Sequence, residues 1–239
     1  MERTDIRMAE LLEVPFRLPE QLKSPKEARK LVAAVVKKVD AFFQTGRPVL
    51  SDRQDAVRRL QADCDEHLYE YFDIIDVERA LIEDTEQVVI ESILPKRASA
   101  TLPTLKEATT DYRRRYVDML CRTLNDWTRE GPYRIHGRTY ASSTSGVATV
   151  ILDRTRNGPP PAGAENDGAA LMTVLDNLQR TFAKELGSIE LLRGVKVFDK
   201  ETLYLFKPLA QRFWTRTAAL NDADDIAATI LMRSRKERA

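Results

Sequence analysis

Basic and aromatic side chains gather near the C-terminal end of the chain, where their types could support binding chemistry. Lys207, Arg212 and Arg216 flank Phe213 and Trp214. Cationic groups bind phosphate oxygens, and an aromatic ring beside them can stack on a nucleobase. We therefore predict a nucleic-acid contact through Lys207, Arg212 and Arg216, with Trp214 as a stacking residue. The alternative is that both aromatic residues belong to the core and the arginines pair with acids on neighbouring helices.

A second basic cluster, Arg113, Arg114 and Arg115, lies near the start of a predicted long helix. We rank it next as a candidate for DNA-backbone contacts. The whole chain argues against dedicated DNA binding, because 38 basic and 37 acidic side chains leave a net charge of only +1. Nucleic-acid binders usually carry a basic excess, since phosphate neutralisation supplies much of their affinity. Any DNA contact is therefore expected to be local.

Soft metal ligands are few. Cys64 and His67 lie three residues apart on a predicted helix and share a face, but Cys121 and His136 are distant in sequence. A structural zinc site normally has two closely spaced ligand pairs. We expect no metal site, with Cys64 in the core and His67 on the surface.

The acidic residues Asp222, Asp224 and Asp225 are a second candidate for a cation site. At this spacing on a helix, carboxylates fan around the axis and do not converge on one ion. We predict a solvated helix face.

Sequence motifs of catalysis are absent. The chain contains no G-x-S-x-G, no G-x-G, no Walker-type Gly-Lys-Ser/Thr, and neither Asp-x-Lys nor Glu-x-Lys. These patterns mark nucleophile elbows, phosphate-binding loops and many metal-dependent nuclease sites. We therefore favour a non-enzymatic role without a cofactor, and keep a nuclease with an unrecognised site as the enzymatic alternative.

The N-terminal part, residues 1–100, is predicted to be helical. After a charged arm, helices begin at Ser24-Pro25, at Ser51-Asp52 and at Asp76, each with a capping residue and an apolar stripe at helical spacing. Residues 95–103 contain two prolines and are the predicted domain boundary.

The second part, residues 101–239, is predicted to be α+β. A capping box at 104–107 opens a long helix, with an inward stripe of Tyr112, Tyr116, Met119, Leu120, Leu124 and Trp127. Hairpins are expected near 133–152 and 195–206, a mobile loop at 154–168, and helices at about 169–186 and 209–232. The predicted fold is a predominantly helical α+β protein: a helical N-terminal part, then an antiparallel sheet of two hairpins backed by helices.

Cellular context follows from what the sequence lacks. Two cysteines cannot form a disulfide framework, the first residues lack the apolar core of a signal peptide, and no apolar run approaches the ~18 residues of a membrane span. We expect a cytoplasmic protein without membrane contact.

Four stretches resemble known proteins. Residues 68–72 (LYEYF) and 77–85 (VERALIEDT) are similar to a helical segment beyond the catalytic domain of large bacterial adenine-specific DNA methyltransferases. Residues 116–127 (YVDMLCRTLNDW) and 203–225 (LYLFKPLAQRFWTRTAALNDADD) resemble regions that accompany such enzymes in restriction and anti-phage systems.

Such methyltransferases also carry a glycine-rich loop for S-adenosylmethionine and an Asn-Pro-Pro-aromatic motif. This chain has neither, because residues 157–160 read Asn-Gly-Pro-Pro. The resemblance therefore implies an accessory module that works beside a separate enzyme.

Together these observations predict a non-catalytic subunit of a bacterial DNA-modification or anti-phage assembly. Its expected partner is a larger protein such as a methyltransferase, helicase or nuclease, with DNA-backbone contacts as an additional role. The alternative is a structural interaction protein that dimerises without binding nucleic acid.

Overall fold

The computed structural model describes residues 16–44, 50–93, 101–156, 164–165, 167–182, 195–199 and 201–236. The chain forms two compact units, Met1–Arg79 and Ala80–Ala239. The division falls inside helix α4 (Asp76–Asp84), earlier than the boundary predicted at 95–103. It does so because Ala80 is fully buried in the core of the second unit and Asp84 hydrogen-bonds to helix α8 (Arg216–Lys236).

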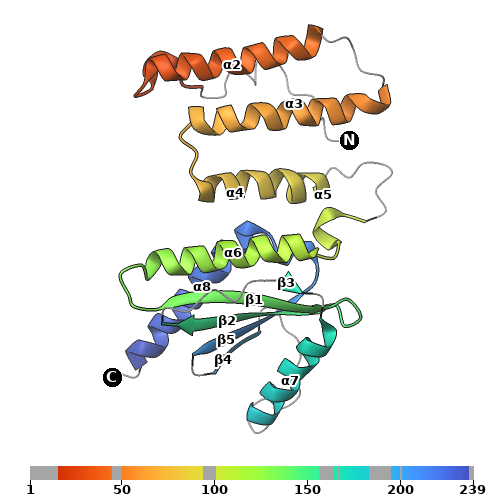
Figure 1. The fold of residues 1–239 in the computed structure, drawn as a ribbon, viewed down its shortest axis with the longest axis vertical. Coiled ribbons are helices and arrows are strands. Elements are labelled where there is room, and N and C mark those ends of the chain that lie inside the picture. The colour runs from red at the N-terminus through yellow and green to blue at the C-terminus, as the bar shows by residue number, and fades with distance from the viewer. Residues whose placement is uncertain are drawn as a thin grey trace. The chain divides into compact units, whose positions relative to one another are not determined.

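The first unit is built on two helices, α2 (Pro25–Gln44) and α3 (Leu50–Tyr71), preceded by a 3-10 turn η1 (Pro19–Gln21). Figure 1 shows α2 and α3 side by side. The predicted start at Pro25 is present, since proline suits the first turn of a helix. Among the described residues of this unit, the buried apolar side chains are Ala28, Cys64 and Tyr71. This is a small core for two helices of about 30 Å.

The third predicted helix is present over residues 76–93, but it is not regular. Helix α4 passes into a π-helical turn, η2 (Thr85–Ile90), before α5 (Glu91–Ile93). Ala80, Asp84 and Val88 are buried at steps of four residues. In a regular α-helix each such step overshoots the face by about 40°. The wider π turn brings Val88 back toward the face of Ala80 and Asp84.

The second unit contains a sheet in the order β3-β1-β2-β5-β4. Its two antiparallel hairpins, β1–β2 and β4–β5, lie where the sequence predicted them, and β2 pairs with β5. The strands are β1 (Arg134–Ser142), β2 (Val147–Thr155), β3 (Ala164–Glu165), β4 (Val195–Asp199) and β5 (Thr202–Pro208). The prediction of a loop over 154–168 is wrong at β3, which pairs in parallel with Thr139 and Tyr140; residues 157–163 lie outside the described part.

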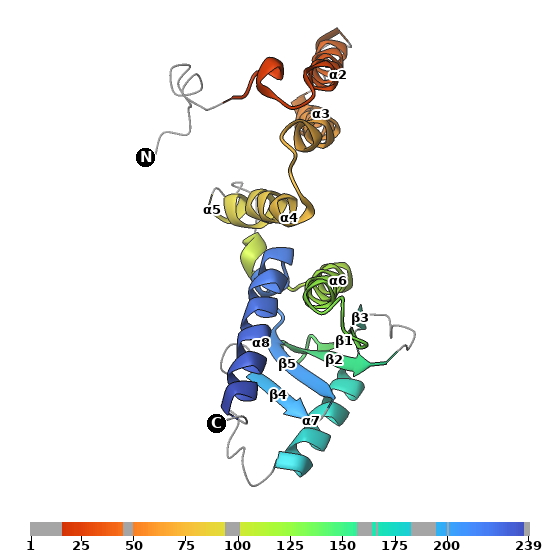
Figure 2. The ribbon, with the colours of Figure 1, turned by 90° about the vertical axis from the view of Figure 1, so that its left-hand side faces the viewer.

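Helices cover both faces of this sheet. Helices α6 (Thr110–Trp127) and α8 lie against one face, and α7 (Gly168–Phe182) lies against the other (Figures 1 and 2). Side chains alternate along a strand, so Leu205 packs with α6 and α8 while Phe206 packs with α7. The predicted α+β fold, a helical N-terminal part followed by two hairpins backed by helices, is confirmed.

Two predicted helix starts are wrong. Helix α6 begins at Thr110 and not at the capping box 104–107, because the Lys106 carbonyl accepts the Gln211 N–H and the Ala108 N–H bonds to the Leu209 carbonyl, both at 2.7 Å. The same pairing holds residues 209–211 out of helix α8, which begins at Arg216. The Thr109 hydroxyl caps α6 by accepting the Tyr112 N–H.

The residues predicted to face inward on helix α6 are buried or half-buried, except for Trp127 at its end, which is 51% exposed. No helix among the described ranges is both long enough and apolar enough to cross a bilayer.

Gly137 of β1 provides a test of how closely strand β1 packs against helix α6. A Cβ atom there would lie 2.5 Å from Val117 Cγ1 and 2.8 Å from Cys121 Sγ of helix α6. We expect Gly137→Ala to lower the free energy of unfolding by about 1–3 kcal/mol, as overpacking does. The matched control is Gly168→Ala, whose Cβ would meet Ser142 at an ordinary 3.4 Å. Urea unfolding of both variants measures the difference, and equal stabilities would contradict the close approach of β1 to α6.

Candidate functional site

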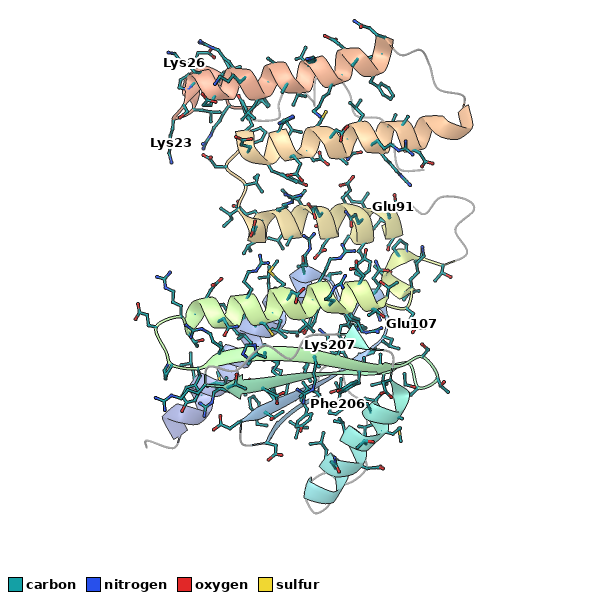
Figure 3. The ribbon with its side chains drawn as sticks, in the orientation of Figure 1. Lys23, Lys26, Glu91, Glu107, Phe206 and Lys207 are labelled. Atoms are coloured by element: carbon teal, nitrogen blue, oxygen red, sulfur yellow. The ribbon has the colours of Figure 1, made fainter. Side chains whose placement is uncertain are left out.

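The predicted nucleic-acid residue Lys207 lies inside the second unit. Its side chain is 5% exposed, and its Nζ atom forms an ion pair with Asp222 of helix α8. The ammonium also lies over two rings, 4.1 Å from the centroid of Tyr116 and 5.6 Å from that of Trp214. Figure 3 shows Lys207 between α6 and the sheet, with Phe206 on the opposite face. We call Lys207, Asp222, Tyr116 and Trp214 the buried lysine cluster.

Every polar group of the buried lysine cluster has a partner. The Tyr116 hydroxyl donates to Asp222 Oδ2 at 2.6 Å, and Trp214 Nε1 donates to the Pro208 carbonyl at 2.8 Å. Burial lowers the pKa of Lys207, an effect that Asp222 opposes. Burial, and then the Asp222 charge, raise the pKa of Tyr116 well above its usual range. The cluster therefore joins strand β5 to helices α6 and α8, and it does not present Lys207 or Trp214 to a nucleic acid.

Two predicted arginines also act within the fold. Arg113 is 1% exposed and donates to the Ala108 carbonyl at 2.8 Å, and burial lowers its pKa. Arg216 binds Glu83 at 2.6 Å, and its Nε lies 3.7 Å from Asp84. The Asp84 carboxylate accepts the Thr217 N–H at 2.7 Å, so it caps the start of α8. Both arginines are therefore engaged in internal contacts.

The remaining predicted cations are exposed. Arg114 and Arg115 both bind Asp111 within helix α6, and Arg115 first, then Arg114, hold the pKa of Asp111 below its usual value. Arg212 stacks on Phe213 with its Cζ 4.8 Å from the ring centroid. Of the seven residues proposed from the sequence, Lys207, Trp214 and Arg113 are buried and Arg216 is half-buried. The seven residues therefore do not form one accessible basic surface. The alternative stated for the sequence, in which the aromatic residues belong to the core and the arginines pair within the fold, describes the structure better.

The acidic trio is also not a uniform solvated face. Asp222 belongs to the buried lysine cluster, which corrects the prediction for that residue. Asp225 pairs with Lys196 of strand β4, and Asp224 is exposed. Within the described ranges, no three His, Cys, Asp or Glu side chains are grouped as metal ligands. Cys64 is buried, and burial raises the pKa of Cys121 to about 12, so the latter thiol stays protonated at neutral pH.

One polar cluster on the α7 side of the sheet was not predicted. Asp153 accepts from Arg138 Nη1 at 2.5 Å and from Thr202 Oγ1 at 2.9 Å. Strand register also places His136 opposite Asp153. The buried His136 Nε2 atom has no hydrogen-bond partner in the described part of the chain. Asp153 of β2 already accepts from Arg138 of β1 and Thr202 of β5. We therefore interpret these three residues as a polar contact that links the three strands. Period-two spacing along the strands was the signal that could have revealed it.

An apolar cleft of about 250 Å³ opens at one end of the second unit's core. Leu124, Ile135 and Ile226 contribute to its lining. An exposed ion pair between Arg154 and Glu201 lies at the same place, with Arg154 over the Tyr133 ring. Such a lining can receive a small apolar group but offers no paired nucleophile and base.

Helix α2 of the first unit exposes apolar side chains on a face that does not meet α3. Ala28 is buried, and Leu31, Val35 and Phe42 are half-buried, as expected for the face that packs against α3. A second set of residues, displaced by one position or about 100° around the axis, is exposed. These residues, which we call the α2 seam, are Arg29, Ala33, Val36, Asp40 and Phe43.

Four residues of the α2 seam, Arg29, Ala33, Val36 and Asp40, line a hollow of about 570 Å³ together with Pro19 of the preceding turn. Val36 is 51% exposed and Phe43 is 74% exposed, which is unusual for large apolar side chains at regular helical spacing. In the sequence, Val36 and Phe43 belong to the apolar residues that recur at helical spacing along this helix, and that spacing does not show which of them meet α3. A surface of this kind is suited to another helix and not to catalysis.

The buried lysine cluster yields a stability test. We expect Asp222→Ala to lower the free energy of unfolding by about 3–5 kcal/mol, because it leaves the Lys207 ammonium buried without its counter-charge. Replacing both partners with apolar residues, Lys207→Met with Asp222→Leu, should recover most of that loss. Urea denaturation followed by circular dichroism measures each variant. A double variant as unstable as Asp222→Ala would show that the pair contributes more than charge compensation.

Comparison with known proteins gives no assignment: no family model, no curated protein and no solved structure matches this chain.

Proposed function

We propose that the chain is a non-catalytic, cytoplasmic subunit that holds protein chains together through helix α2 of its N-terminal unit. The observation that carries this proposal is the α2 seam. Helix α2 already packs against α3, yet it exposes a second row of side chains that includes Val36 and Phe43. An isolated chain gains nothing from exposing apolar residues in register, whereas a partner helix would bury them.

The placement of charged side chains in the second unit supports a protein contact over a DNA contact. Lys207 and Arg216 form ion pairs with carboxylates of the same unit, and Arg113 donates to a backbone carbonyl there. Arg114 and Arg115 share Asp111, which reduces the local basic excess. Phosphate binding depends on accessible, uncompensated cations. Arg212 is the exposed member that remains best placed for a DNA contact of secondary importance.

The kind of assembly remains a prediction from the sequence resemblance. That resemblance favours a DNA-modification or anti-phage system, in which the partner would be a methyltransferase, helicase or nuclease. A scaffold role is compatible with this setting because such a system needs chains that position an enzyme without sharing its chemistry.

Affinity capture with paired variants tests the proposal. A tagged chain is recovered from its native host, with and without nuclease treatment, and bound proteins are identified and quantified. We expect stoichiometric protein partners that survive nuclease treatment and fall at least tenfold with the double variant Val36→Asp, Phe43→Asp, because two buried carboxylates oppose the interface.

The matched control is Met172→Asp on helix α7, which changes a side chain of similar exposure, 54%, in the other unit. It should retain the partners. Equal loss with Met172→Asp, or recovery that depends on nucleic acid, would contradict the proposal. Circular dichroism of the three purified chains verifies that each variant keeps its helices.

A further inference from the structure

The α2 seam has the spacing of a coiled coil. Its residues follow one another at steps of four, three, four and three, which is the alternation of a and d positions in a heptad repeat. All five are exposed on one unbroken helix, α2. Ala33 and Val36 form the apolar middle, flanked by Arg29 on one side and by Asp40, then Phe43, on the other. A small residue beside a larger one leaves room for a facing helix to approach closely.

The charges of the seam are complementary to themselves. In an antiparallel pair, an a position faces a d position of the other helix. If Ala33 faces Val36 of a second copy, Arg29 then faces Asp40, and symmetry forms each contact twice. Arg29 is exposed, and its guanidinium donates to Glu20 of the preceding turn at 2.8 Å in a pair that is itself exposed. Asp40 is exposed on the same face.

The length of helix α2 selects the same register. The twofold axis of this pairing passes between Ala34 and Val35, which is also the midpoint of Pro25–Gln44. The two helices would therefore overlap along their full length of about 30 Å. A shift by one heptad would shorten the overlap in either direction. It would place Asp40 against Val36 of the facing helix in one direction and Arg29 against Ala33 in the other, so a charge would be buried without its counter-charge.

The ends of the pair are covered in this register as well. Phe43 faces Lys26 of the second copy, and Lys26 is exposed near the start of the helix (Figure 3). The aliphatic stem of a lysine can cover an aromatic ring while its ammonium stays in water.

We propose that the α2 seam is occupied by helix α2 of a second copy of this chain, in an antiparallel pair with Arg29 facing Asp40 across the twofold axis. This inference rests on the proposed function and names the partner at the same surface. The pair makes the chain a dimeric subunit.

Charge exchange tests the register directly. Sedimentation velocity of the full chain over a concentration series should show a monomer–dimer equilibrium. Arg29→Asp and Asp40→Arg should each raise the dissociation constant at least tenfold, because like charges then meet twice in each dimer. The double variant Arg29→Asp, Asp40→Arg should restore dimerisation. Lys30→Asp is the matched control: it makes the same change in net charge on the same helix, but Lys30 lies beside the seam, and the variant should remain dimeric.

The contrary outcomes separate this inference from the proposed function. A monomeric chain at about 100 µM, or a double variant as weak as the single variants, would overturn the second-copy pairing. If the monomeric chain still recovers a different protein that is lost with Val36→Asp, Phe43→Asp, the proposed function stands with that protein on the seam. A chain that neither dimerises nor recovers a protein partner would contradict the second-copy pairing and the proposed function alike.

Discussion

A buried ammonium group sets the geometry of the second unit. Once Lys207 of strand β5 is enclosed, a carboxylate must be brought to it, and Asp222 of helix α8 meets that requirement. Tyr116 of helix α6 donates to the same carboxylate, so three elements are tied at one point. Desolvating such a charge is tolerated only when its partners are closely placed. The angle and depth at which α6 and α8 lie on the sheet are therefore closely linked to this contact.

The start of helix α8 is also held by polar contacts. Asp84 caps its first turn and Glu83 holds Arg216, so the end of α4 and the start of α8 are joined by ionic and backbone contacts. A carboxylate at a helix N-terminus also interacts favourably with the helix dipole. Polar groups in this unit thus specify how elements meet, while the apolar residues of α6, α8 and the sheet provide most of the buried area.

Periodicity was enough to predict the elements but not their partners. Both hairpins follow from alternating apolar residues within single strands, which have nine residues in β1 and β2, five in β4 and seven in β5, and this signal is local. The capping box at 104–107 satisfied the local rule equally well, yet its backbone pairs with residues 209–211 and the helix starts later. Likewise, Arg216 and Glu83 are 133 residues apart in the chain, so no local pattern could distinguish a paired arginine from a free one. The spacing of Val36 and Phe43 is present in the sequence, but only the position of α3 shows that these two residues lie on the exposed side of α2.

The π turn between α4 and α5 has a consequence for how this chain can change in length. A π turn holds one residue more than a regular helical turn, and here the extra residue keeps Ala80, Asp84 and Val88 in phase. Deleting one residue from Thr85–Ile90 would close the π turn into a regular α-helical turn. Because the wider turn already absorbs the extra residue, the residues after it would keep nearly the same direction around the helix axis relative to Asp84. Ser92, whose hydroxyl donates to the Val88 carbonyl and accepts the Thr104 N–H, would therefore stay close to its present position. The segment is a place where the chain can shorten by one residue while the Asp84 cap and the Ser92 contacts are kept.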